Sequence, residues 1–451
     1  MGLPNRTIAN PPQGRSACNP RPFPASGEVT ERAGPAGRRG WPAKMSDPRN
    51  TIRGVSDVFA DLVGQDEPVE TLRRAAAAAA RVVAGDEVAA GAMTHAWIFT
   101  GPPGSGRSVA ARAFAAALEC ERAGIGCGEC HGCHTALGAT HADVRFVVPE
   151  GLSIGVNDMR ALVLRAASAP SGGRWQVVVI EDADRLTEQA GNALLKAIEE
   201  PPPRTVFLLC TPSTHPDDIS VTIRSRCRVV ALRQPPASAV AEVLTRRDGV
   251  APDVAAWAAA AAQGHVGRAK RLSRDTEARG RREAVLAVPR RLTGVGACYE
   301  AASALIKSAE AEAAESFAES DAAERVALEQ ALGAGGTGRG AAGAMRGAAG
   351  QIKELEKRQK SRATRSKRDA LDRALVDLAG FYRDVLVTTM RAPVSVVHTD
   401  VAAQSGAAAG KWTAESTLRR LEAVLACRDA IDQNVKPDIA VEAMMLTLWR
   451  G

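Results

Sequence analysis

The segment GPPGSGRS at residues 101–108 constrains the fold of this chain more than any other part of the sequence. It follows a short apolar run, AWIFT, and precedes a helix-forming run, VAARAFAAALEC. The glycines Gly101, Gly104 and Gly106 allow backbone N–H groups to approach phosphate oxygens, and the N-terminus of the following helix favours a negative charge. This context predicts a phosphate-binding loop (P-loop) between a buried strand and a helix.

Further apolar runs extend this prediction to a fold class. After the run at 96–100, others lie at 144–148, 176–180, 205–210 and 229–232. Because helical patterns separate them, we expect an α/β P-loop domain with a parallel sheet covered by helices on both faces. The expected parts are an N-terminal extension (1–54), a nucleotide-binding-type domain (55–234), a small helical domain (235–275) and an all-α domain (276–451) with a Gly-rich insertion at 333–344.

The N-terminus and the bulk composition limit the class of protein. Residues 1–44 are rich in Pro, Gly and Arg and lack the apolar core of a secretory signal, so we expect either a disordered tail or a misassigned extension with the natural start at or near Met45. No run approaches the roughly 18 apolar residues of a membrane span. The net charge of +7 fits either an acidic partner such as nucleic acid or a basic solvated surface.

Two features of the expected nucleotide site depart from what hydrolysis requires. Ser108 stands where a hydroxyl would hold Mg²⁺, but the usual lysine is Arg107, whose planar guanidinium does not reproduce a compact ammonium. After the run at 176–180, a hydrolytic site needs Asp and then Glu, whereas this chain has Glu181 and then Asp182. The pattern leaves ATP and Mg²⁺ binding open and predicts that the chain does not hydrolyse ATP efficiently.

Four of the nine cysteines lie close together, at Cys120, Cys127, Cys130 and Cys133. Two C-x₂-C turns that share Cys130 are typical of a zinc site with four thiolate ligands, which leaves no position for a reactive water. The cluster therefore predicts a structural zinc ion. The other cysteines are scattered, so no secreted disulfide framework is indicated, and we expect a reducing, cytoplasmic location.

Several motifs together resemble the bacterial clamp-loader AAA+ family. Val63, Gly64 and Gln65 match its adenine-side segment, a four-cysteine zinc module stands after the P-loop helix, and Thr211 matches the sensor 1 position. Four longer motifs agree: HADV (141–144), NALLKAIEEPP (192–202), GHVGRAKRL (264–272) with Arg268 at the sensor 2 arginine, and NVKPDIAVE (434–442). The small helical domain and the all-α domain then correspond to the family's lid and collar.

The motif IRSRC (223–227) also resembles this family, and it implies a specific function. In this family its arginine, here Arg226, is an arginine finger that reaches the ATP held by a neighbouring subunit. Motor subunits of the gamma/tau type keep the P-loop lysine and the Asp-Glu pair, whereas the delta-prime type loses both. The resemblance therefore implies a delta-prime-type component of the DNA polymerase III holoenzyme, with motor and delta subunits, the sliding clamp and primed DNA as partners.

Two alternatives remain at the level of the sequence. One is an active clamp-loader ATPase of the gamma/tau type. The other is a zinc-containing DNA-binding protein, in which the basic segment 353–368, with eight Lys and Arg against two Glu, contacts phosphates. An exposed helical face is the plainer interpretation of that segment.

Overall fold

The computed structural model describes residues 57–122, 126–172, 174–332 and 341–451, with the backbone alone for 341–348. The expectations for residues 1–44 and Met45, and for most of the Gly-rich insertion, lie outside the described residues. No helix within these ranges is long and apolar enough to cross a membrane.

A parallel sheet of five strands forms the centre of the N-terminal part, in the order β2-β3-β4-β1-β5. The strands are β1 (Ala96–Thr100), β2 (Val144–Val147), β3 (Gln176–Ile180), β4 (Thr205–Thr211) and β5 (Arg228–Ala231). The five predicted strands are confirmed to within one residue at each end. β1 lies between β4 and β5, so the P-loop that follows it starts from inside the sheet.

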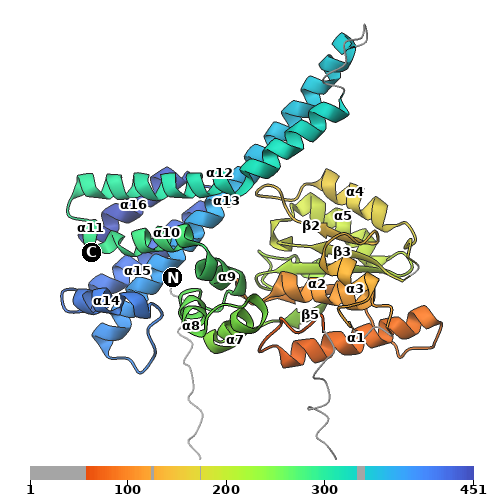
Figure 1. Cartoon of the computed structure of the whole chain (residues 1–451), viewed down its shortest axis with the longest axis horizontal. Coiled ribbons are helices and arrows are strands. Elements are labelled where there is room, and N and C mark those ends of the chain that lie inside the picture. Colours follow the sequence, from red (N-terminus) through yellow and green to blue (C-terminus); the bar gives the residue numbers. More distant parts are fainter. Residues whose placement is uncertain (1–56, 123–125, 173, 333–340) are drawn as a thin grey trace, which may run out of the picture. The chain divides into compact units, whose positions relative to one another are not determined.

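Helices cover both faces of the sheet (Figure 1). One face packs against α1 (Asp66–Ala84), α2 (Arg107–Leu118) and α3 (His131–Leu137), and the other against α4 (Val156–Ala166) and α5 (Glu188–Glu199). Successive residues of β1 pack into the cores on opposite faces of the sheet, because side chains alternate along a strand. Trp97 and Phe99 join the first core, whereas Ile98 joins the second. This burial on both faces explains why the strands appear in the sequence as continuous apolar runs.

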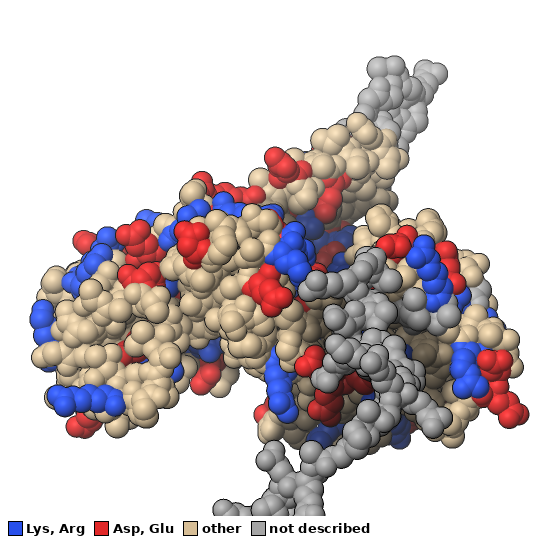
Figure 2. Space-filling view, turned by 60° about the horizontal axis from the view of Figure 1, so that its bottom comes forward, with Lys and Arg blue, Asp and Glu red and all other residues tan. Residues whose placement is uncertain are grey.

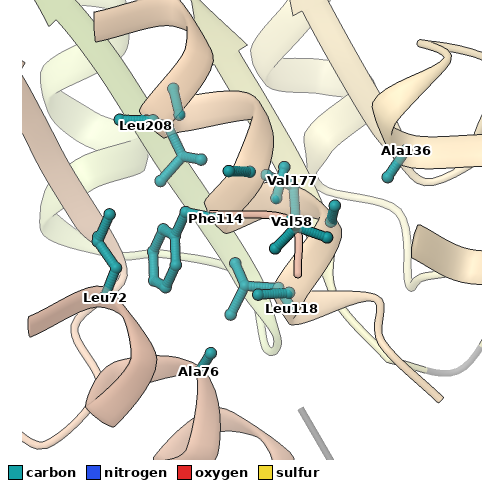
Figure 3. Close-up of a cluster of buried hydrophobic side chains, with 14 of the residues drawn as sticks. Val58, Leu72, Ala76, Phe114, Leu118, Ala136, Val177 and Leu208 are labelled. Atoms are coloured by element: carbon teal, nitrogen blue, oxygen red, sulfur yellow. The ribbon is translucent and has the colours of Figure 1, made fainter. Parts of the chain in front are cut away.

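Phe114 of α2 anchors the first core. Its ring lies 5.0 Å from that of Trp97 in an edge-to-face arrangement, and both side chains are fully buried. Leu72 of α1 and Leu208 of β4 approach the same ring in Figure 3. The packing holds α2, and with it the P-loop at its N-terminus, in a fixed position on β1.

Beyond the short helix α6 (Val221–Arg224), three helices share a small core of their own. They are α7 (Ala237–Asp248), α8 (Pro252–Ala261) and α9 (Val266–Arg274). Val240, Leu244 and Leu272 are the larger aliphatic side chains of that core. The helices fall within the predicted small helical domain.

The rest of the chain is helical, as expected. Its elements are α10 (Thr276–Leu286), α11 (Val288–Arg291), α12 (Val295–Ala331), α13 (Ala341–Met390), α14 (Ala402–Ala409), α15 (Ala414–Asp432) and α16 (Pro437–Arg450). α12 and α13 lie side by side (Figure 1). α13 starts at Ala341, so the last four residues of the predicted Gly-rich insertion are helical instead, three of them being alanines with the highest helix propensity.

Candidate functional site

The three glycines of the P-loop adopt backbone conformations that other residues rarely take. Their φ angles are +154° at Gly101, +86° at Gly104 and +92° at Gly106. A β-carbon on Gly101 would lie 2.4 Å from the carbonyl oxygen of Leu232, and one on Gly104 would lie 2.7 Å from Cα of His265. Glycine is therefore needed here both for its conformation and for the close approach of neighbouring backbone.

A cavity of about 210 Å³ lies against this loop. Six of the residues predicted from the sequence line it: Val63, Gln65, Gly104, Gly106, Arg107 and Ser108. Arg247, His265 and Gly267, from the three-helix segment, line it as well. The structure thus brings the P-loop together with the predicted adenine-side segment, at the edge where strands of parallel α/β sheets end and ligands commonly bind.

Gln65 joins two segments that are far apart in the sequence. Its Nε2 donates to the carbonyl oxygen of Arg233 at 2.5 Å, and its Oε1 accepts from the backbone N–H of Arg233 at 3.1 Å. Nε2 also lies 3.4 Å from the carbonyl oxygen of Ser105 in the P-loop. The side chain is buried, and Gly64 before it has a φ of +69°. The amide of Gln65 is therefore occupied in holding the loop after β5 beside the P-loop.

Arg107 begins α2 at the edge of the cavity. Its Nη1 atom is buried, and no acceptor among the described residues takes a hydrogen bond from it. The hydroxyl oxygen of Ser105 is likewise buried and has no hydrogen-bond partner among the described residues. Because buried donors without partners are costly, the loop favours an acceptor-rich anion at this point.

The two acidic residues after β3 are each paired with an arginine of the same chain. Oε1 of Glu181 lies 3.6 Å from Nη2 of Arg112 on α2, and the Arg112 guanidinium also stacks 4.5 Å from the ring centre of Phe146. Asp182, with a φ of +51°, forms an ion pair with Arg365 of α13. Carboxylates engaged in this way are less available to a divalent cation or an attacking water.

Thr211 and Arg268 are predicted site residues that do not line the cavity. Thr211 ends β4, and its hydroxyl donates to the carbonyl oxygen of Ser213 at 2.9 Å. Nη2 of Arg268 lies 2.5 Å from a carboxylate oxygen of Asp377 in α13, with 11% and 4% of the two side chains exposed. Gly267 lines the cavity in its place, since neighbouring residues of a helix point about 100° apart.

Arg226 follows α6 and lies at the surface, with 38% of its side chain exposed. Its Nη2 is 2.8 Å from Oε1 of Glu199 at the end of α5, and its Nη1 donates to the carbonyl oxygen of Thr222 at 2.9 Å. It does not line the chain's own cavity. Its guanidinium is thus held by contacts within this chain and also reaches solvent.

The four clustered cysteines converge as predicted. The sulfur atoms of Cys120, Cys127, Cys130 and Cys133 lie within 4.8 Å of one another, and all four residues are buried. A tetrahedral zinc ion with sulfurs at about 2.3 Å would separate them by roughly 3.8 Å, so a small contraction completes the site. Backbone N–H groups approach three of the sulfurs at 3.4 to 3.5 Å, as they do around thiolate ligands. The group is therefore suited to hold a metal ion.

Part of the chain is similar in sequence to subunits of DNA polymerase III. Residues 80–236 match the family model described as DNA polymerase III, delta subunit. Residues 80–236, which make up less than half of the chain, are thus similar in sequence to this family. Among relatives, the DNA polymerase III subunit tau of Bacillus subtilis is 34% identical over 172 residues, covering 38% of this chain and 28% of that protein. The DNA polymerase III subunit delta' of Pseudomonas aeruginosa is 40% identical over 157 residues, covering 34% and 47%.

The chain spans less than half the length of either relative. A solved structure, a DNA polymerase III gamma subunit-related protein from Thermotoga maritima, is 15% identical, covers 83% of this chain and 99% of its own, and has a TM-score of 0.35. The similarity to DNA polymerase III subunits therefore lies in the sequence of the matched segment.

Two residues that border this cavity are not among those predicted from the sequence. Arg247 lies there with its Nη1 2.8 Å from a carboxylate oxygen of Asp61. His265 caps α9 by accepting from the backbone N–H of Arg268 at 3.2 Å, and burial followed by the charge of Arg268 lowers the pKa of its imidazole. Its place directly before the helical part of GHVGRAKRL is the sequence feature that could have identified His265, because polar residues often precede helices.

Proposed function

We propose that this chain is a delta-prime-type clamp-loader subunit of the DNA polymerase III holoenzyme, which helps to place the sliding clamp on primed DNA. Its partners are then the motor (gamma/tau) and delta subunits, the clamp and the DNA. In this role the chain contributes to hydrolysis by a neighbour and does not itself turn over ATP efficiently.

A single contrast in side-chain exposure carries the proposal. The carboxylates that would serve hydrolysis, Glu181 and Asp182, are each paired with an arginine of this chain and are 18% and 30% exposed. Arg226 is also paired, with Glu199, but 38% of its side chain is exposed at the surface. A site that performs hydrolysis keeps its acidic groups free for Mg²⁺ and water. A site that assists a neighbour needs an accessible cation.

Arg226 would act on the ATP of the adjacent motor subunit. A guanidinium that approaches a transferring phosphoryl group neutralises the charge that develops on its oxygens. Arg226 first has to leave Glu199, with which its Nη2 is paired at 2.8 Å. Because 38% of the Arg226 side chain and 45% of the Glu199 side chain are exposed, water can replace part of this ion pair, which lowers the cost of the exchange.

The chain's own cavity is suited to hold a nucleotide without hydrolysing it. The glycines of the P-loop, the buried donor of Arg107 and the hydroxyl of Ser108 favour phosphate oxygens. When bound, Mg²⁺ would neutralise phosphate charge beside Ser108. Glu181 and Asp182, engaged with Arg112 and Arg365, would contribute little to that metal or to water activation.

The four cysteines would hold a structural zinc ion. Four thiolates complete a tetrahedral shell, so the ion would have no open position for substrate. α3 starts directly after Cys130 and contains Cys133. The ion would therefore fix α3 and the preceding turn against α2, which bears the P-loop at its N-terminus.

Reconstitution tests the proposal directly. Purified motor and delta subunits, the sliding clamp and primed DNA are combined with and without this chain, and clamp loading is measured by fluorescence. Loading should require the chain, and it should persist in the variant Arg107→Ala, whose own site is impaired. Efficient loading without the chain, or loss of loading with Arg107→Ala in an intact assembly, would contradict the proposed role.

A further inference from the structure

The positive charge of the basic segment 353–368 is largely used inside the molecule. Five of its eight Lys and Arg residues form ion pairs with carboxylates of this chain: Lys357, Arg358, Arg362, Arg365 and Lys367. On the face of the molecule drawn in Figure 2, basic and acidic side chains are intermixed. Most of the segment's charge is therefore already compensated before any partner binds.

Arg358 makes the outermost contact between α13 and the sheet domain. Its Nε lies 2.6 Å from one carboxylate oxygen of Glu150, and its Nη2 donates to the other, so the pair is bidentate. The Arg358 hydrogen bonds lower the pKa of Glu150 below its usual range. Glu150 lies in the loop after β2, at the carboxyl end of that strand.

Two further contacts follow along the same face of α13. Ser361 packs so closely on the backbone after Glu150 that a β-carbon on Gly151 would lie 2.3 Å from its hydroxyl oxygen. Arg365 donates to the carboxylate of Asp182 and to the carbonyl oxygen of Pro149. Positions 358, 361 and 365 are three and four residues apart, and that spacing aligns side chains on one face of a helix.

The same helix continues into the core of the C-terminal part. Leu371, Leu375 and Leu378 of α13 are fully buried there, and Tyr382 stacks 5.9 Å from the ring of Trp412. One continuous helix therefore touches the carboxyl ends of β2 and β3 with one segment and is fixed in the helical core with the next.

We propose that residues 358–365 of α13 form an intramolecular clamp on the carboxyl ends of β2 and β3, and that Arg365 positions and neutralises Asp182. This inference goes beyond the proposed function, because every contact that carries it lies within this chain. It assigns Arg358 and Arg365 of the basic segment to internal coupling between the sheet and the C-terminal helices, and it removes these two side chains as nucleic-acid contacts.

A charge exchange on the full-length chain tests the clamp. Arg358→Glu and Glu150→Arg are made singly and together, and backbone hydrogen exchange is followed at residues 148–152 and 181–186. Each single variant should speed exchange about threefold, the size expected for a well-ordered surface ion pair, and the double variant should restore the wild-type rate. Lys357→Glu, on the neighbouring and 79% exposed side chain, is the matched control and should leave exchange unchanged.

Two results would overturn the clamp. The first is wild-type exchange in both single variants, or a double variant that exchanges as fast as the singles. The second comes from DNA binding by the full chain: Arg358→Ala combined with Arg365→Ala should leave affinity for a primed duplex within twofold. A loss of tenfold or more, with a shallower salt dependence, would make the two arginines phosphate contacts.

Discussion

Nη2 of Arg112 lies 3.6 Å from Oε1 of Glu181, so that a guanidinium from α2 faces the first carboxylate after β3. The next carboxylate, Asp182, meets Arg365 from a helix that is distant in the sequence. The acidic groups of the nucleotide site are therefore paired with cations of the protein itself. This arrangement gives a physical reason for the proposal that the chain binds a nucleotide without hydrolysing it. It adds to two features of the sequence, Arg107 in place of lysine and the order Glu181 then Asp182.

The first prediction concerns this site in the isolated chain. Steady-state ATP hydrolysis should lie near background, and Arg107→Lys should not raise it, because Glu181 and Asp182 remain paired. Arg107→Ala should weaken binding of a fluorescent nucleotide about tenfold or more, as expected for the loss of one charged hydrogen-bonding group. Rapid hydrolysis that disappears in Arg107→Ala would instead identify an active ATPase of the gamma/tau type.

A second prediction concerns the glycines. Gly104→Ala should lower the midpoint of urea unfolding more than Gly85→Ala, although both residues have φ near +87°, because only the β-carbon at 104 would meet the backbone of His265. The conformational strain common to both variants is about 1 kcal/mol. A Gly104→Ala protein as stable as Gly85→Ala would show that the P-loop does not contact the three-helix segment in this way.

Metal content provides the third prediction. Purified under reducing conditions without chelator, the chain should carry about one zinc ion, measured by elemental analysis. Cys133→Ser should lose the ion, whereas Cys298→Ser, equally buried but outside the cluster, should retain it. A chelator should lower the melting temperature of the wild type and leave that of Cys133→Ser unchanged. Absence of zinc from the wild type would show that the four cysteines do not form a zinc site.

The sequence predicts those parts of the site that depend on local spacing. The strands were predicted because fully buried parallel strands are continuous apolar runs, and the four cysteines because C-x₂-C turns direct two sulfurs to one point. The pairs Arg268–Asp377 and Arg365–Asp182 span 109 and 183 residues. No local pattern encodes such pairs, because they depend on how the C-terminal helices pack. Arg268 was accordingly expected at the nucleotide and lies against α13 instead.

The fourth prediction is a dependence of stability on pH. His398 is buried, its Nδ1 accepts from Arg282 at 2.9 Å, and its Nε2 lies 3.1 Å from the carbonyl oxygen of Asp377. Burial, and then the charge of Arg282, lowers the pKa of the imidazole, so the folded state favours the neutral ring. The stabilisation is present above the ordinary histidine value of about 6.5 and is lost as pH falls through the lowered pKa.

The measurement compares urea unfolding at pH 7.5 and pH 5.5. The wild type should lose stability on acidification, and His398→Gln, which cannot take up a proton, should lose less. Asp384 and Asp400 also lie near this histidine, and both are present in the wild type and in His398→Gln, so the difference between the two proteins reports on the histidine. An equal loss in both proteins would mean that His398 does not contribute to the pH dependence.

The proposed role of Arg226 is to act on the ATP of a neighbouring subunit, and the variant Arg226→Ala in the assembled loader tests that role. DNA-dependent ATP hydrolysis by the complex should fall about 100-fold or more, while assembly, followed by gel filtration, remains intact. Arg224→Ala, an exposed arginine two residues away, is the control and should retain the wild-type rate. Unchanged ATP hydrolysis in a fully assembled Arg226→Ala loader would contradict the claim.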